Sequence, residues 1–521
     1  MRRFLGFAFA LRAAFCIAAL MQAAESKDAL FLVLEMSLIT AGILLASWPF
    51  RIALMPAVFM EALQLSSLCM TGFYTDPNTI QNIGLTETVG SAAYAAAAIA
   101  VGYLVLWIPD FCISRCTTRA KAFLRAAPLL VLALLAAVPL TPNRLFLTTL
   151  QEAWDCISFR MSNDMSIKDS FARRFDPTPR IPDGLRCKGC NVILIFAEGT
   201  SSRILSESLT PNSAGFLRNA FRVKRYYNHQ AATFRGIRGT LTSGFTLKGG
   251  SFQHRGFTEI SEEELLADYS GTLESLPSLL NNAGYRTVFL SPHHEDDALA
   301  PLMKAVGFDT AECIKTQNVD SQTYEILFDR AEALDRESAP FFLSAYIFGT
   351  HHGLDTQNCR YGDGSNTYFN KFHCQDLAFG AFLKRFFASP LAKNTVLIWT
   401  TDHATFPSTE FRRSFHAEVE FFHDEIPLAI HSPNESSRRR AVFNARHRTS
   451  ITLAPTVLDI LDIAAPKTHF LGNSLFATPT SWERYCAQGY RLFRVEDSGM
   501  VRRTHDSGVQ RKLRLFYSFS G

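Results

Sequence analysis

The sequence predicts an N-terminal helical transmembrane bundle followed by an α/β domain with a mostly parallel sheet and helices on both faces. Two patterns lead to this fold class. The first third of the 521 residues holds nearly all of the long apolar runs. Beyond it, apolar runs of strand length alternate with segments of helical periodicity, which is typical of a parallel sheet covered by helices. We therefore expect a transmembrane domain at 1–143, a connector at 144–187 and a globular domain at 188–521.

Five apolar segments predict membrane-spanning helices, at 4–24, 29–48, 52–70, 90–108 and 126–140. Most of them approach the roughly 20 residues that a bilayer requires, and the fifth is the shortest. The first segment is similar to a secretory signal, with two arginines before it and small residues at its end. Because cleavage would leave the later spans without their orienting partner, we expect an uncleaved anchor.

The basic residues predict the orientation of these spans. Arg2, Arg3, Arg51 and the basic residues at 115–125 fall on one side in a five-span count, whereas the loop 73–88 has no lysine or arginine. Loops rich in Lys and Arg stay in the cytoplasm, so the domain after the fifth span is expected outside it. The net charge of +4 gives no reason to expect a nucleic-acid partner.

An extracytoplasmic location allows disulfides among the seven cysteines that follow the spans. Seven is odd, so at least one stays unpaired within the chain. Cys187-Lys-Gly-Cys190 fits a redox or zinc pair, but with no second CxxC there a short disulfide loop is favoured. Cys359 and Cys374 bracket a polar insertion and are the best candidates for a second bridge.

Several further elements are predicted outside the strands discussed below. The stretch 145–161 looks amphipathic and fits either a surface-lying helix or an ordinary linker helix. In the globular domain, Phe379, Phe382, Leu383 and Phe386 share one helical face, which indicates core packing against the sheet. The remaining expected elements are helices at 272–283, 376–388 and 450–461 and a strand at 426–431.

Four apolar runs end in side chains suited to metal binding or acid–base chemistry. The carboxyl ends of parallel strands meet at one edge of a sheet, and in such sheets the chemistry sits beyond that edge. One strand ending in a solvated carboxylate is common, but four such ends indicate a single site. The residues at these ends are Glu198, the pair His293 and His294, the pair His351 and His352, and the pair Asp402 and His403.

A hydroxyl-rich segment at 226–245 is the expected source of a nucleophile. Thr233 lies in it, followed by Arg235 and Arg238, whose guanidinium groups suit a phosphoryl or sulfuryl group. A hydroxyl is a weak nucleophile until a metal or a base activates it. The alternative for any one threonine here is a helix cap.

Four segments together resemble the sulfatase/alkaline-phosphatase superfamily: 191–200, Thr233-Phe-Arg-Gly, Thr401-Asp402-His403 and 453–461. Within it they look most like the membrane-anchored phosphoethanolamine transferases and the lipoteichoic acid synthase group. The resemblance covers most of 191–476 in motif order and implies the α/β fold of that superfamily. Five spans and the loop 74–87 also fit the phosphoethanolamine branch.

The resemblance implies a metal site. Glu198, Thr233, Asp402 and His403 would hold one divalent ion, zinc or manganese, with Thr233 as the nucleophile. This set of oxygen and nitrogen donors suits both metals.

The resemblance also implies residues around the substrate. His351 would be a catalytic histidine on the substrate side, and His352 and Arg235 would bind substrate. The usual Asp-His-Gly-Glu continuation is replaced after His403 by Ala-Thr. This departure leaves the ligand of a second zinc ion open, and His416 is the nearest candidate.

By resemblance, the protein is expected to be a membrane-integral transferase of the bacterial inner membrane with a periplasmic catalytic domain. It would move a head group from a phospholipid donor to an envelope glycan or lipid acceptor through a threonine-linked intermediate. The head group would be phosphoethanolamine or, as in lipoteichoic acid synthases, phosphoglycerol. A hydrolase of the same fold and a non-catalytic scaffold are the alternatives. The loop expected to carry the nucleophile holds no Cys/Ser-x-Pro-x-Arg motif, which argues against a sulfatase, and the four metal-type residues argue against a scaffold.

Overall fold

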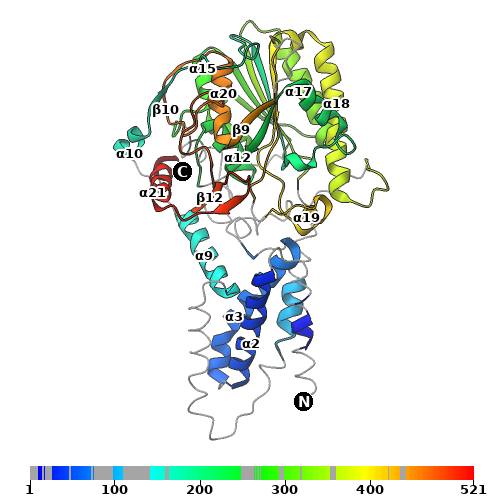
Figure 1. Cartoon of the computed structure of the whole chain (residues 1–521), viewed down its shortest axis with the longest axis vertical. Coiled ribbons are helices and arrows are strands. Elements are labelled where there is room, and N and C mark those ends of the chain that lie inside the picture. Colours follow the sequence, from blue (N-terminus) through cyan, green and yellow to red (C-terminus); the bar gives the residue numbers. More distant parts are fainter. Residues whose placement is uncertain are drawn as a thin grey trace. The chain divides into compact units, whose positions relative to one another are not determined.

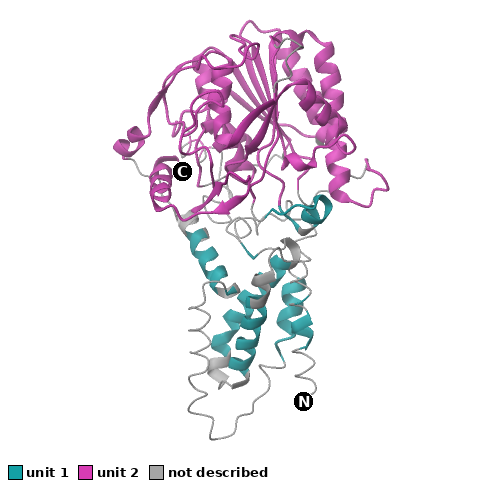
Figure 2. Ribbon diagram, in the orientation of Figure 1, with its two compact units in different colours: residues 1–155, 407–420 teal, residues 156–406, 421–521 magenta. Residues whose placement is uncertain are grey.

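A computed structural model describes much of the chain as two compact units (Figure 2). The first comprises 1–155 and 407–420, and the second comprises 156–406 and 421–521. The described residues are 10–14, 17, 26–45, 48–71, 74–75, 98–108, 141–158, 164–247, 263, 266, 269, 271–292, 299–316, 319–351, 359–419, 422–434 and 442–520.

The first unit is helical. Its described elements include α2 (Ser26–Leu45), α3 (Trp48–Thr71), most of α9 (Pro142–Ser158) and α19 (Thr409–Phe415). An apolar cluster joins α2 and α3 through buried side chains such as Leu32, Met36, Leu54 and Val58.

The five predicted spans are not confirmed. None of the helices in the described part of the chain combines the length and the apolar character that crossing a membrane requires. The predicted span 4–24 is described only at 10–14 and 17, and 90–108 only at 98–108. The span 126–140 and nearly all of the loop 73–88 lie outside the described residues.

Helix α9 corresponds to the amphipathic stretch expected at 145–161. Phe146 is buried, whereas Leu147, Leu150 and Trp154 are 46%, 39% and 64% exposed. Their spacing of three and four residues places the exposed side chains on one helical face. The amphipathic character is confirmed, and a surface-lying role stays a prediction.

The second unit is built on an eight-stranded sheet in the order β5-β4-β6-β2-β7-β8-β3-β9. β8 runs antiparallel to both of its neighbours, and all other neighbouring pairs are parallel. The mostly parallel sheet is therefore confirmed. Its strands are β2 (Asn191–Ala197), β3 (Phe221–Tyr227), β4 (Arg286–Ser291), β5 (Thr310–Cys313), β6 (Phe341–Ile347), β7 (Thr395–Thr400), β8 (Leu428–His431) and β9 (Val442–Thr449).

Helices cover both faces of this sheet, as predicted. In β2, Val192 and Leu194 belong to one apolar core and Ile193 and Ile195 to the other, because alternate side chains point to opposite faces. One core takes α12 (Thr233–Thr242), α15 (Leu276–Asn282), α16 (Leu299–Val306) and α20 (Leu453–Ile460). The other takes α11 (Pro211–Asn219), α17 (Val319–Asp335) and α18 (Thr367–Ala388) (Figure 1).

The aromatic face predicted for α18 is confirmed. Phe379, Phe382 and Phe386 are buried in the second core, and Leu383 packs against it partly buried. The helix begins earlier than expected because the Asn366 side chain caps it by accepting from Phe369 N.

Smaller elements surround the main sheet. β1 (Arg173–Phe175) pairs with β10 (Ala465–Thr468), and β11 (Tyr485–Gln488), β12 (Arg491–Val495) and β13 (Val501–Arg503) form an antiparallel sheet. The others are α10 (Met165–Ser170), η1 (Ser202–Ile204), η2 (Pro390–Lys393), η3 (Ser450–Thr452) and α21 (Ser507–Ser520).

Both predicted disulfides are present. Cys187 bonds to Cys190 and Cys359 to Cys374, with Cα–Cα distances of 5.5 and 5.8 Å. Cys486 is wholly buried and takes part in neither bridge.

Candidate active site

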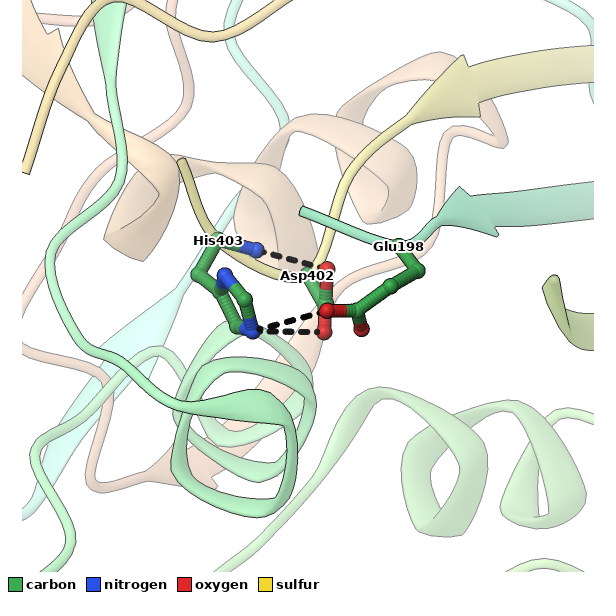
Figure 3. Close-up of side chains that lie close together, drawn as sticks. All are labelled: Glu198, Asp402 and His403. Atoms are coloured by element: carbon green, nitrogen blue, oxygen red, sulfur yellow. Dashed lines mark hydrogen bonds and ion pairs between the residues drawn. The ribbon is translucent and has the colours of Figure 1, made fainter. Parts of the chain in front are cut away.

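The first part of the site is formed where two neighbouring strands end. β2 pairs with β7 in parallel, with Phe196 opposite Thr400, so the two strands end at the same level. Glu198 follows β2, and Asp402 and His403 follow β7 after one intervening residue. Their three side chains therefore converge at one edge of the sheet (Figure 3).

Glycines allow the chain to approach this edge closely. Gly199 turns the chain after Glu198 with φ +52°, a conformation that favours glycine, and its N–H donates to Asp402 Oδ1 at 3.0 Å. In α12, a Cβ at Gly236 would lie 2.3 Å from the Asp402 carbonyl oxygen. Glycine at 236 therefore lets the first turn of α12 pack directly on the end of β7.

Thr233 is the first residue of α12 and reaches the same cluster. Its hydroxyl donates to Glu198 Oε2 at 3.2 Å and lies 3.3 Å from His403 Nε2. The structure thus brings together all four predicted metal-site residues. They are nearly removed from solvent, with exposed fractions of 3% for Glu198, 7% for Thr233, 0% for Asp402 and 2% for His403.

The donor atoms are oriented for a cation. His403 Nδ1 donates to Ala404 O at 2.7 Å, so the neutral ring carries no proton on Nε2. Nε2 lies 3.2 Å from Asp402 Oδ2 and 3.5 Å from Glu198 Oε1 (Figure 3). Asp402 Oδ2 is buried and accepts no hydrogen bond from the residues that the structure describes.

The electrostatics of the cluster also favour a cation. Burial, and then the nearby charge of Asp402, raises the pKa of Glu198 well above its ordinary value. Two buried carboxylates this close are stabilised when positive charge lies between them. Across the described residues, Glu198, Asp402 and His403 are the one such group of His, Cys, Asp or Glu whose ligand atoms all lie within 4.8 Å. Two carboxylates, an imidazole and a hydroxyl fit a divalent metal ion.

His351 lies at the same edge of the sheet. It follows β6, which pairs with β2 on the side away from β7. Its ring is partly buried beside Phe348, with the ring centres 4.9 Å apart. The preceding Thr350 donates its hydroxyl to the Glu198 carbonyl oxygen, which ties the two strand ends together.

Other predicted site residues are placed differently or not described. His416 ends α19 in the first unit with φ +48°, is exposed, and is not part of the cluster. His293, His294 and His352 lie outside the described residues.

The two arginines of the nucleophile segment have partners in the protein interior. Arg235 is 3% exposed, and its Nε and Nη1 donate to Ala231 O at 3.0 Å and Leu247 O at 3.3 Å. Arg238 donates from Nη2 to Ser520 O at 2.6 Å, and burial lowers its pKa to about 10. These contacts anchor α12, and substrate binding by Arg235 stays a prediction.

Tyr346 is the site residue that sequence reasoning missed. It lies in β6, is wholly buried, and donates its hydroxyl to Glu198 Oε2. Its hydroxyl also interacts with that of Thr233. In the sequence it lies within an apolar run, which predicts core packing. The only indication of a role in the site was its hydroxyl group near the end of that run.

The fold and the cluster define an α/β protein with a candidate divalent-metal site at the carboxyl edge of its sheet. A model of the sulfatase family, described as Sulfatase, matches residues 190–463, more than half of the chain. The chain therefore belongs to the sulfatase family. No curated protein matches it.

Solved structures are similar to this chain at low sequence identity. A protein of the alkaline phosphatase superfamily from Vibrio parahaemolyticus is 17% identical with a TM-score of 0.51, covering 70% of this chain and 97% of its own. The lipoteichoic acid synthase LtaP from Listeria monocytogenes is 15% identical with a TM-score of 0.50, covering 68% and 96%. The C-terminal periplasmic domain of EcEptC from Escherichia coli is 15% identical with a TM-score of 0.41, covering 60% and 94%.

Proposed function

We propose that this protein is a metal-dependent transferase that moves a phosphoethanolamine or related phospho-alcohol head group from a phospholipid to an envelope glycan or lipid. One observation carries the proposal: the Thr233 hydroxyl lies among the metal-type ligands, 3.2 Å from Glu198 and 3.3 Å from His403. A hydroxyl in that position can act as a nucleophile and hold the head group between donor and acceptor.

The four cluster residues would hold the metal ion. When bound, a divalent ion supplies positive charge that favours loss of the Thr233 proton and neutralises phosphoryl oxygens. Glu198 and Asp402 contribute the two negative charges of the set. His403 contributes its unprotonated Nε2, because Nδ1 is held as a donor by the Ala404 carbonyl.

The proposed reaction has two displacements. In the first, a bond forms between Thr233 Oγ1 and phosphorus as the bond from phosphorus to the diacylglycerol oxygen breaks. The Thr233 proton passes to solvent, and diacylglycerol leaves with a proton that His351 at the same sheet edge would supply. In the second, an acceptor hydroxyl gives its proton to His351, which the first step left unprotonated, and attacks phosphorus; the bond to Oγ1 breaks, and the Thr233 oxygen takes a proton back from solvent.

The position of Thr233 at the start of α12 suits a negatively charged intermediate. The N-terminal end of a helix carries partial positive charge and unpaired N–H groups, which stabilise phosphoryl oxygens. α12 has ten residues, long enough for this effect.

Threonine at 233 favours phosphoryl transfer over sulfate-ester hydrolysis. Sulfatases use a formylglycine made from Cys or Ser in a Cys/Ser-x-Pro-x-Arg motif, whereas this segment reads Thr233-Phe-Arg-Gly. Phosphoglycerol transfer of the lipoteichoic acid synthase type differs from our proposal in the head group. Hydrolysis differs in the acceptor, which is then water.

We also propose that 1–143 anchors the enzyme in the bacterial inner membrane and that the second unit is periplasmic. The two disulfides support an oxidising compartment for this unit. The charge asymmetry of the N-terminal loops supports the same orientation.

The test uses the purified full-length chain with phosphatidylethanolamine or phosphatidylglycerol labelled in the head group. We expect diacylglycerol release and label on a glycan or lipid acceptor from phosphatidylethanolamine, lost after chelation and in Thr233→Ala. Transfer from phosphatidylglycerol alone would establish the phosphoglycerol reaction instead, and label released only as free head group would establish a hydrolase. If neither lipid loses its head group, the transferase proposal is wrong.

A further inference from the structure

Tyr346, in strand β6, places its hydroxyl against Glu198, one of the proposed metal ligands. In β6 it is paired with Phe196 of β2, two residues before Glu198. The side chain is wholly buried in the core on one face of the sheet. From there its hydroxyl donates to Glu198 Oε2. Packing therefore fixes this hydroxyl more firmly than a surface side chain could be fixed.

The two oxygens of Glu198 have different neighbours. Oε2 accepts from Tyr346 and from Thr233, the latter at 3.2 Å. Oε1 lies 3.5 Å from His403 Nε2. The last torsion of a glutamate has a broad energy profile, so hydrogen bonds to the carboxylate select its orientation.

We propose that Tyr346 is a positioning residue that orients Glu198 for the metal ion through its hydroxyl. This inference rests on the metal-dependent function proposed above. Hydrogen-bond donors behind a ligand typically contribute 10- to 100-fold to metal affinity. Tyr346 acts through Glu198, so its contribution should disappear when Glu198 can no longer serve as a carboxylate ligand.

The chain offers a matched control in Tyr324. It lies in α17, is 2% exposed, and its hydroxyl accepts from Gln375 Nε2 at 2.9 Å. Its ring packs on Phe379 and Phe382, in the core on the opposite face of the sheet. Tyr324→Phe therefore also removes one buried tyrosine hydroxyl, but at a position away from the site.

The test measures the zinc dissociation constant of the full chain by competition with a chromophoric chelator. We expect Tyr346→Phe to raise it by about 10- to 100-fold and Tyr324→Phe by less than about threefold. Unfolding midpoints of the chelated proteins show whether the two changes cost similar stability. A Tyr346→Phe protein that binds zinc as tightly as the wild type would overturn the proposal, and so would an equal loss in Tyr324→Phe.

A double-mutant cycle with Glu198→Gln separates positioning from a general loss of structure. In the Glu198→Gln background, Tyr346→Phe should leave the remaining zinc affinity unchanged; a further 10-fold loss would contradict action through Glu198. The outcome is independent of transfer activity. If Tyr346→Phe weakens zinc binding but no lipid loses its head group, the proposed function fails and this inference stands. If lipid loses its head group but Tyr346→Phe binds zinc as tightly as the wild type, the proposed function stands and this inference fails.

Discussion

At the scale of single residues, the Asp402 carboxylate is the strongest indication of a cation. Oδ1 accepts from Gly199 N at 3.0 Å and His403 N at 2.9 Å, whereas the buried Oδ2 accepts nothing from the described residues. An uncompensated buried charge costs several kcal/mol, so a protein retains one where a ligand compensates it. The free oxygen points to the same place as His403 Nε2, 3.2 Å away.

Asp402→Asn should therefore abolish tight metal binding. The substitution keeps the shape of the side chain but removes the charge, so metal content after dialysis should fall from about one ion per chain to near zero. Asp376→Asn is the control: Asp376 is equally buried but accepts from Asn212 N and Ser213 N, away from the cluster. Full metal content in Asp402→Asn, measured by elemental analysis, would contradict the assigned site.

Burial of His229 predicts a pH dependence of stability. Burial lowers the pKa of His229 from 6.5 to about 4, and the hydrogen bond between Nε2 and Gly244 O offsets only part of this shift. The folded state thus disfavours the protonated ring. The contribution of the buried neutral His229 ring to the free energy of unfolding is complete above pH 6.5, and it is lost as the pH falls toward 4.

The expected loss is about 3 kcal/mol in the free energy of unfolding between pH 6.5 and 4. Denaturant titrations of the chelated protein at several pH values measure it. His229→Gln should show a shallower decline over this interval than the wild type. An equal decline in both proteins would assign the acid sensitivity to other groups.

At the scale of elements, the site depends on how closely α12 approaches the end of β7. Gly236→Ala would place a Cβ 2.3 Å from the Asp402 carbonyl oxygen, so the helix or the strand end must shift. We expect at least a 10-fold loss of metal affinity, because ligands from the two elements would no longer meet.

Gly215→Ala is the matched control for this prediction. Gly215 also lies in a helix, α11, where an added Cβ meets only Arg218 Nη2 at 3.7 Å. Alanine there should leave metal binding unchanged and raise stability by about 0.5–1 kcal/mol. Wild-type metal affinity in Gly236→Ala would show that the approach of α12 is less constrained than the geometry indicates.

Strand ends could be predicted from the sequence, and contacts between distant segments could not. Glu198, Asp402 and His403 follow apolar runs, and parallel strands bring such ends to one edge. The sequence could not show that β8 runs antiparallel to its neighbours, because an apolar run carries no information about strand direction. The backbone partner of Arg238, Ser520, lies 282 residues away, so nothing local identified it.

At the scale of the whole molecule, the orientation of the chain decides where the chemistry occurs. A reporter fused after Pro182 should be active outside the cytoplasm, and one fused near Arg119 should be active only inside it. The asymmetry of basic residues in the N-terminal loops is the physical reason. The reverse pattern of reporter activity would contradict both the periplasmic location of the second unit and its access to outer-leaflet lipid.

The proposed two-step transfer requires that Thr233 carry the head group covalently, and intact-protein mass spectrometry after mixing with donor lipid detects this adduct. We predict a mass increase of one head group, mapped to Thr233 by peptide analysis, absent in Thr233→Ala and partly retained in Thr233→Ser. An adduct on Thr200, Thr240 or Thr242 would identify that threonine as the nucleophile, and the covalent mechanism would stand. No adduct on any residue, together with full turnover by Thr233→Ala, would rule out a covalent transferase.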